Sequence, residues 1–105
     1  MAERSVKIVN KNGLHARPAA EIVKTASKFT SDIIIVRDEL EVNGKSIMGV
    51  MMLAAECGTS LTLRADGDDA AEAMDALQAL VAAGFHEMEI PRDYFDESES
   101  AEDSA

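Results

Sequence analysis

Residues 33–42 read IIIVRDELEV, and this stretch decides the class of fold. The β-branched run Ile33–Val36 predicts a buried strand. Asp38-Glu39 then makes a tight turn, and Leu40-Glu41-Val42 returns as the second half of a hairpin. Hairpin pairing of this kind favours an antiparallel sheet.

Apolar periodicity predicts five further elements around the hairpin. They are strands near residues 4–10 and 61–65, a helix that begins at Ala16, a short helix after Ser46 that runs through Leu53, and a helix over about 69–83. Residues 66–69 supply a turn and acidic caps for the last helix, and Gly84 stops it. The order βαββαβα with antiparallel strands predicts an α+β domain of two layers, with helices on a common face of the sheet.

The composition fits one small domain followed by an acidic segment. The chain has 105 residues, of which 47% are hydrophobic, enough for a single core. Residues 1–85 carry 12 acids and 9 bases, whereas residues 86–105 carry 8 acids and 1 base. We therefore expect a folded domain over 1–85 and a largely disordered tail over 86–105. The overall net charge of −10 argues against a nucleic-acid partner.

Several absences indicate a cytoplasmic protein. The single cysteine, Cys57, excludes an intramolecular disulfide and indicates a reducing compartment. The first residues show no signal peptide, and no apolar run approaches the ~20 residues that span a bilayer. We expect no insertion into a membrane.

His15 is the main candidate for chemistry. It lies in Gly13-Leu14-His15-Ala16-Arg17-Pro18, where a glycine turn meets a helix N-terminus. Taken alone, a loop histidine is more often a solvated residue or a cap. Here, however, the free amides of Ala16 and Arg17 and the helix dipole would hold an anion attached to the imidazole. Arg17 adds a fixed cation, so the arrangement suits a phosphoryl group on a histidine nitrogen.

Other chemistries fit this stretch poorly. A metal needs about three or four protein ligands, and no Cys, His or carboxylate lies near His15 in the sequence. A hydrolytic triad would need a nucleophile, and the nearest candidates, Ser5 and Thr25, carry no motif. We predict no metal and no cofactor.

Three separated stretches resemble the HPr family, the histidine-containing phosphocarriers of the bacterial phosphoenolpyruvate-dependent phosphotransferase system. They are residues 12–19 (NGLHARPA), 45–51 (KSIMGVM) and 65–67 (ADG), within a match over about residues 4–85. The resemblance implies an open-faced sandwich with strand order 1-4-2-3 and three helices on one face. It also implies a phosphoryl carrier that needs partner enzymes, rather than an enzyme itself.

The resemblance assigns roles to individual residues. His15 would accept phosphate from enzyme I on Nδ1 and pass it to IIA components of sugar permeases, with Arg17 and the amides of Ala16 and Arg17 holding the group. Ser46 would be the regulatory serine that HPr kinase/phosphorylase modifies. The partner-docking residues would be Lys24, Ile47, Met48, Met51 and Met52. We expect a monomer.

The short helix supports a docking role without the resemblance. Val50 and Leu53 can share its inward face, but Ile47, Met48, Met51 and Met52 cannot all join them. Some of these side chains must be exposed, and exposed methionines suit several partners. The alternative is that the helix simply belongs to the core.

Three features of the sequence allow more than one interpretation. Met52, Glu56 and Cys57 depart from the family pattern, and Glu56 could lie close to Arg17 and compete with phosphate. The acidic tail is either dispensable for transfer or masks the basic rim around Arg17 and Lys24. The chain could also be a regulatory module that acts mainly through Ser46, although relatives of that kind lack the histidine.

Overall fold

The computed structural model describes residues 1–86. The elements are β1 (Ala2–Lys7), α1 (Ala16–Ala26), β2 (Asp32–Arg37), β3 (Leu40–Asn43), α2 (Ile47–Met52), β4 (Ser60–Asp66), α3 (Ala70–Ala82) and a 3₁₀ turn, η1 (Gly84–His86). The predicted order βαββαβα is confirmed, with η1 added after the last helix. The tail predicted to be disordered lies, beyond His86, outside the described residues.

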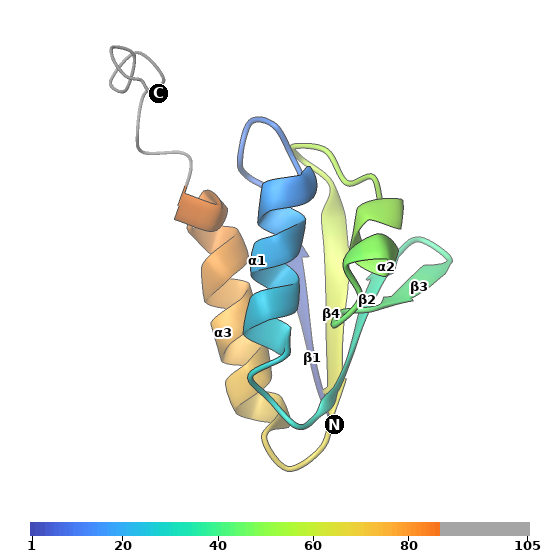
Figure 1. The fold of residues 1–105 in the computed structure, drawn as a ribbon, viewed down its shortest axis with the longest axis vertical. Helices are drawn as coiled ribbons and strands as arrows, with labels where there is room; N and C mark the ends of the chain where they lie inside the picture. The colour runs from blue at the N-terminus through green and yellow to red at the C-terminus, as the bar shows by residue number, and fades with distance from the viewer. Residues whose placement is uncertain (87–105) are drawn as a thin grey trace.

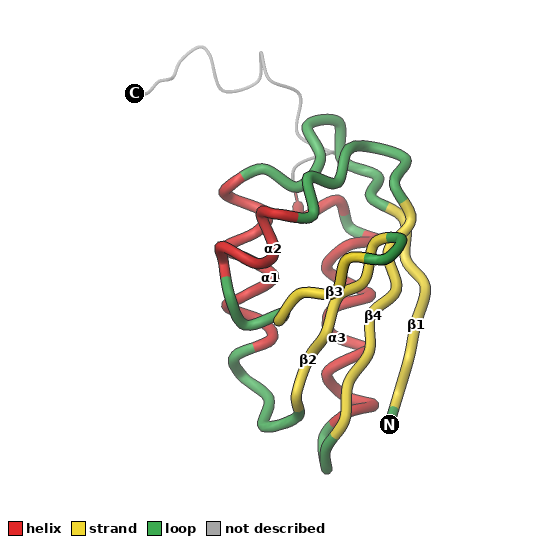
Figure 2. Tube along the Cα trace, turned by 90° about the vertical axis from the view of Figure 1, so that its right-hand side faces the viewer, coloured by secondary structure: helices red, strands yellow, loops and turns green. Residues whose placement is uncertain are grey.

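The four strands form one antiparallel sheet in the order β1-β4-β2-β3, as expected. The helices lie on one side of this sheet and leave the other side uncovered (Figure 2). Helices α1 and α3 stand side by side in front of the sheet and run in opposite directions (Figure 1). The start of α1 and the end of α3 therefore lie at the same end of the molecule, which we call the site end.

The core lies between the sheet and the helices. Strand residues that point to the covered face are almost fully buried, and the apolar stripe predicted for α3 is buried with them. The largest fully buried side chains of the core include Ile8, Ile22, Ile33, Ile35, Leu61, Leu63, Met74 and Leu77. Burying side chains of this size contributes about 1.5–3 kcal/mol each to folding.

Two strand predictions need correction. The first strand spans Ala2–Lys7 rather than residues 4–10, because the chain leaves the regular ladder after Lys7. Ile33 and Ile35 are buried as predicted, but Ile34 and Val36 are only half-buried. The sheet has an uncovered face, so a run of β-branched residues does not mean burial on both sides here.

The predicted acidic caps of the last helix are also wrong. Asp69 occupies the N-cap position of α3, but its carboxylate makes no capping hydrogen bond to that helix. It accepts instead from the backbone N–H groups of Thr30 (2.9 Å) and Ser31 (3.0 Å) and from the Ser31 hydroxyl (2.5 Å). Asp69 therefore ties α3 to the loop between α1 and β2.

Candidate functional site

His15 lies at the site end, as the N-cap residue of α1. Its backbone is extended (φ −79°, ψ −173°), and its carbonyl accepts the first helical hydrogen bond from Ala19 N at 3.0 Å. The residue is exposed, whereas Leu14 before it is buried. The imidazole is therefore presented to solvent from a backbone that is fixed on both sides.

Two loops hold that backbone in place. Leu14 N donates to Ala55 O at 2.8 Å, which joins the loop before α1 to the loop after α2. Gly13 has a φ of +69°, as the sequence predicts, and the buried side chain of Asn10 donates to its carbonyl at 2.8 Å. A Cβ atom on Gly13 would lie 2.6 Å from Ala55 O. Glycine is therefore required by the close approach as well as by φ.

The first turn of α1 carries the donors that the predicted anion site would need. Ala16 and Arg17 have no intrahelical acceptor for their amides, and Pro18 has no N–H to offer. Within residues 1–86, no hydrogen bond or ion pair engages the exposed Arg17 guanidinium. Two backbone donors and one fixed cation are thus available beside His15, a set suited to a phosphoryl group.

The short helix α2 exposes the residues that the sequence could not place in the core. Val50 and Leu53 are 0% and 1% exposed, whereas Met48 and Met52 are 73% and 64% exposed. Ile47 and Met51 are exposed as well. The alternative that α2 simply belongs to the core is therefore wrong. Because α2 packs beside α1, on which Lys24 is also exposed, these side chains flank one surface.

Ser46 is the N-cap of α2, as predicted. Its Oγ accepts a hydrogen bond from Gly49 N at 3.1 Å. The residue is half-buried and is followed directly by the exposed Ile47 and Met48. A negative charge placed on Ser46 would therefore lie at the edge of an apolar patch.

Arg37 is a supporting residue that the sequence analysis missed. From the end of β2, its guanidinium donates to Leu53 O at 2.7 Å and to Ala54 O at 2.9 Å. These carbonyls end α2, so Arg37 fixes both that helix and the loop that binds Leu14. An arginine at the end of a predicted strand carries no signal of this role.

Glu56 and Cys57, which depart from the family pattern, both lie in the loop between α2 and β4. The Cα of Glu56 would lie 2.9 Å from a Cβ on Gly13, so its loop packs against the loop before His15. No ion pair joins Glu56 to Arg17 among the described residues. The exposed Cys57 places its Sγ 3.8 Å from Val9 O.

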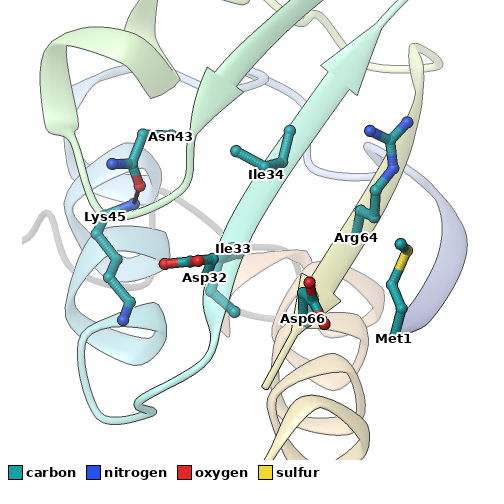
Figure 3. A pocket seen from close by; sticks show the side chains of 9 residues that line it. Met1, Asp32, Ile33, Ile34, Asn43, Lys45, Arg64 and Asp66 are labelled. Atoms are coloured by element: carbon teal, nitrogen blue, oxygen red, sulfur yellow. Dashed lines mark hydrogen bonds between the residues drawn. The ribbon is translucent and has the colours of Figure 1, made fainter.

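A separate hollow of about 370 Å³ lies on the uncovered face of the sheet (Figure 3), and Met1, at the end of the molecule opposite the start of α1 (Figure 1), is among its lining residues. Arg64 and Lys45 line it together with Asp32 and Asp66, which are directly opposite each other in the β2–β4 register. None of the predicted site residues lines it. Within residues 1–86 there is no cluster of three or more His, Cys, Asp or Glu side chains suited to a metal.

The family profile described as "PTS HPr component phosphorylation site" matches residues 2–83. The chain belongs to the HPr family. The HPr of Cupriavidus necator is 51% identical over 89 residues, which are 85% of this chain and 100% of that protein.

Solved HPr structures share the fold. The crystal structure of HPr-C-His from Thermoanaerobacter tengcongensis has a TM-score of 0.80 and 50% identity, covering 83% of this chain and 98% of its own. Crh of Bacillus subtilis, described as a catabolite-repression protein and a dimer with a swapping domain, has a TM-score of 0.65 and 46% identity, covering 80% and 97%.

Membership of the HPr family establishes the general role. The chain is a phosphocarrier of the phosphotransferase system and not an enzyme in its own right. Within residues 1–86, every helix is too short or too polar to cross a bilayer.

Proposed function

We propose that His15 accepts a phosphoryl group from enzyme I, in the cytoplasm, and passes it to IIA components of sugar permeases. The observation that carries this proposal is the position of His15 at the start of α1, beside the Arg17 guanidinium and two amides that have no acceptor within residues 1–86. The geometry allows a phosphoryl group on the imidazole to receive hydrogen bonds from backbone and side chain together.

The site holds a phosphoryl group without enclosing it. His15, Ala16 and Arg17 are all exposed, so the active site of a partner can reach the imidazole nitrogen in line with the bond that forms or breaks. Stabilisation from one side leaves the other side open to the donor or the acceptor. This arrangement suits a carrier, because the group must be released as readily as it is accepted.

The docking surface would be formed by Lys24 on α1 and by Ile47, Met48, Met51 and Met52 on α2. Their exposure, next to the histidine-bearing helix, supports this assignment. Methionine side chains adapt to different partner surfaces, which suits a protein that must bind both a donor and several acceptors.

The test is phosphorylation by purified enzyme I and phosphoenolpyruvate, followed by intact mass measurement. We expect one added phosphoryl group, stable in alkali and lost in acid. His15→Ala should abolish it, and His86→Ala, which removes the chain's only other histidine, should not. An acid-labile phosphate that persists in His15→Ala would contradict the assignment. Transfer of the phosphoryl group to a purified IIA component tests the second half of the proposal, the donation from His15 to an acceptor.

Ser46 would be a regulatory site for HPr kinase/phosphorylase. Its place beside Ile47 and Met48 supports this function, because a phosphate of charge about −1.5 to −2 would oppose docking of an apolar partner surface. The kinase with ATP should add one acid-stable phosphate to the chain and none to Ser46→Ala.

A regulatory interaction module is the second candidate function, and the similarity to Crh favours it. The two functions differ in their dependence on His15. A regulatory module would keep its partner binding in His15→Ala, whereas the carrier would lose all transfer to IIA components. The oligomeric state, for which we expect a monomer, should be measured in the same experiments, since Crh is described as a dimer.

A further inference from the structure

Three exposed cations that have no hydrogen-bond or ion-pair partner within residues 1–86 lie on α1 or directly after it. Arg17 and Lys24 lie on this helix and Lys28 follows it, against one carboxylate, Glu21. Within residues 1–86, the cations that are already engaged lie elsewhere: Arg4 with Asp75, Arg64 with Glu3 and Glu41, and Arg37 and Lys45 with backbone carbonyls. A domain with an excess of acids therefore keeps a basic surface along α1, the helix that begins at the site end.

An apolar surface adjoins this basic one. Helix α2 packs beside α1 and exposes Met48 and Met51, which nothing within residues 1–86 covers. We call the exposed residues Arg17, Lys24, Met48 and Met51 together the α1–α2 face. An occupant of this face would need acidic groups for α1 and apolar groups for α2.

The chain leaves the folded domain at the end where this face begins. Because α3 runs opposite to α1, its last turn lies level with the first turn of α1 (Figure 1). Phe85 is 5% exposed and packs in the core, which fixes the exit point. The remaining residues, 87–105, can span at most about 60 Å, more than enough to reach α1 and α2.

The sequence of residues 87–105 has the composition that the α1–α2 face requires. It contains eight acids and one base, and its apolar residues Met88, Ile90, Tyr94 and Phe95 stand among these acids. Its negative charge is complementary to the cations of α1, and its two aromatic rings are complementary to the methionines of α2.

We propose that residues 87–105 bind the α1–α2 face of their own chain and compete there with partner proteins. This inference rests on the proposed function, because the face is the surface that carrier partners would use. The tether raises the effective concentration of the segment to the order of millimolar, so even a weak contact is populated. A contact that occupies the face half of the time doubles the apparent KM for a partner.

The direct test is an NMR comparison of the full chain with a chain that ends at His86. The Cupriavidus HPr aligns over its whole length with 85% of this chain, so the fold does not need the extra segment. We expect amide shift differences at Arg17, Lys24 and residues 47–52, and we expect them to disappear in about 0.5 M salt. Differences confined to residues 82–86 would overturn the proposal.

Charge variants of the full chain distinguish a specific contact of residues 87–105 from a general effect of net charge. The first variant removes four acids of the segment: Asp93→Asn, Asp96→Asn, Glu97→Gln and Glu99→Gln. The matched control removes four acids of the domain: Glu39→Gln, Asp66→Asn, Asp68→Asn and Glu72→Gln. Only the first variant should reproduce the spectrum of the shortened chain. Equal effects of both variants would mean a general charge effect and reject the contact.

The kinetic test measures phosphoryl transfer from enzyme I at low salt. The KM for the full chain should be about two- to five-fold higher than for the shortened chain, with kcat unchanged. Equal KM values would reject competition at the face. Shift differences that grow with protein concentration would show the segment binding a second copy and reject the intramolecular contact. If no chain is phosphorylated at His15, the proposed function fails, while the NMR comparison still decides the contact.

Discussion

The hydroxyl of Ser31 donates a 2.5 Å hydrogen bond to the carboxylate of Asp69, across 38 positions of sequence. The backbone N–H groups of Thr30 and Ser31 bind the same carboxylate. The bond to the Ser31 hydroxyl and the bond to the Thr30 amide lower the pKa of Asp69 from 3.8 to about 2. The turn before α3 and the turn after α1 are thus held together at the end of the molecule opposite His15.

The first prediction is an acid-dependent loss of stability. Because the pKa of Asp69 is lower in the folded state than in the unfolded chain, its charged form stabilises the fold above about pH 5. This contribution is lost as the pH falls through about 4 toward 2. Asp69→Asn should lower Tm at pH 7 and flatten the dependence of Tm on pH in this range.

Asp68→Asn is the matched control for Asp69→Asn. It removes the same charge one residue earlier, from a side chain that makes no hydrogen bond to Thr30 or Ser31. Thermal melts of both variants between pH 2 and 7 test whether the hydrogen bonds of Asp69 cause the pH dependence of Tm. A pH profile of Asp69→Asn that parallels the unmodified chain would show that the three hydrogen bonds do not matter for stability.

The second prediction concerns the close approach of Gly13 to Ala55. Gly13→Ala should destabilise the fold by about 1–3 kcal/mol and slow phosphoryl transfer, because the new Cβ would displace the loop that carries His15. Gly58→Ala separates the steric contact with Ala55 from the strain of a positive φ as the cause of slow transfer. Gly58 also has a positive φ, +94°, but nothing lies within 4 Å of a Cβ there. Slow transfer in Gly58→Ala as well would assign the effect to backbone strain alone.

The third prediction is that Arg17→Ala impairs transfer and leaves the fold intact. A charge-assisted hydrogen bond of about 1.5–3 kcal/mol to the phosphoryl group would be lost from the transition state of transfer, which slows transfer by roughly ten- to hundred-fold. Arg17 is exposed, so Tm should stay within about a degree. Lys7→Ala, which removes an exposed cation from β1, should leave the rate unchanged. A rate for Arg17→Ala equal to that of Lys7→Ala would remove Arg17 from the site.

The fourth prediction distinguishes the two properties of Ser46. Ser46→Ala removes the hydrogen bond to Gly49 N and should cost about 1 kcal/mol of stability, with near-normal transfer. Ser46→Asp keeps an acceptor at the N-cap, so its Tm should match or exceed that of the unmodified chain. Its charge beside Ile47 and Met48 should slow transfer from enzyme I about ten-fold. Slow transfer with a lowered Tm would mean that the fold, and not the docking surface, had been damaged.

Local patterns predict the order of the elements correctly. The alternation in residues 61–65, the stripe on α3 and the glycine turn before His15 each depend on neighbours in sequence. The exposure of Met48 and Met52 can also be predicted from the local sequence, because a six-residue helix has one buried face and cannot bury every apolar side chain.

What the sequence could not predict depends on partners that are distant along the chain. Asp69 stands where a helix cap is expected, and only the fold shows that the loop at Ser31 takes its carboxylate. Arg37 stands at the end of a predicted strand, where an arginine is expected to face solvent, yet it donates to the carbonyls that end α2. The half-buried state of Ile34 depends on which face of the sheet lacks helices.

The antiparallel course of α1 and α3 also governs what can be attached to this protein. Met1 lies at the opposite end of the molecule from His15, among the residues that line the hollow on the uncovered face. The described chain ends at η1, at the same end of the molecule as the first turn of α1. A fluorophore or affinity tag joined near residue 86 would therefore crowd the phosphorylation site, whereas the same group joined before Met1 would leave it open.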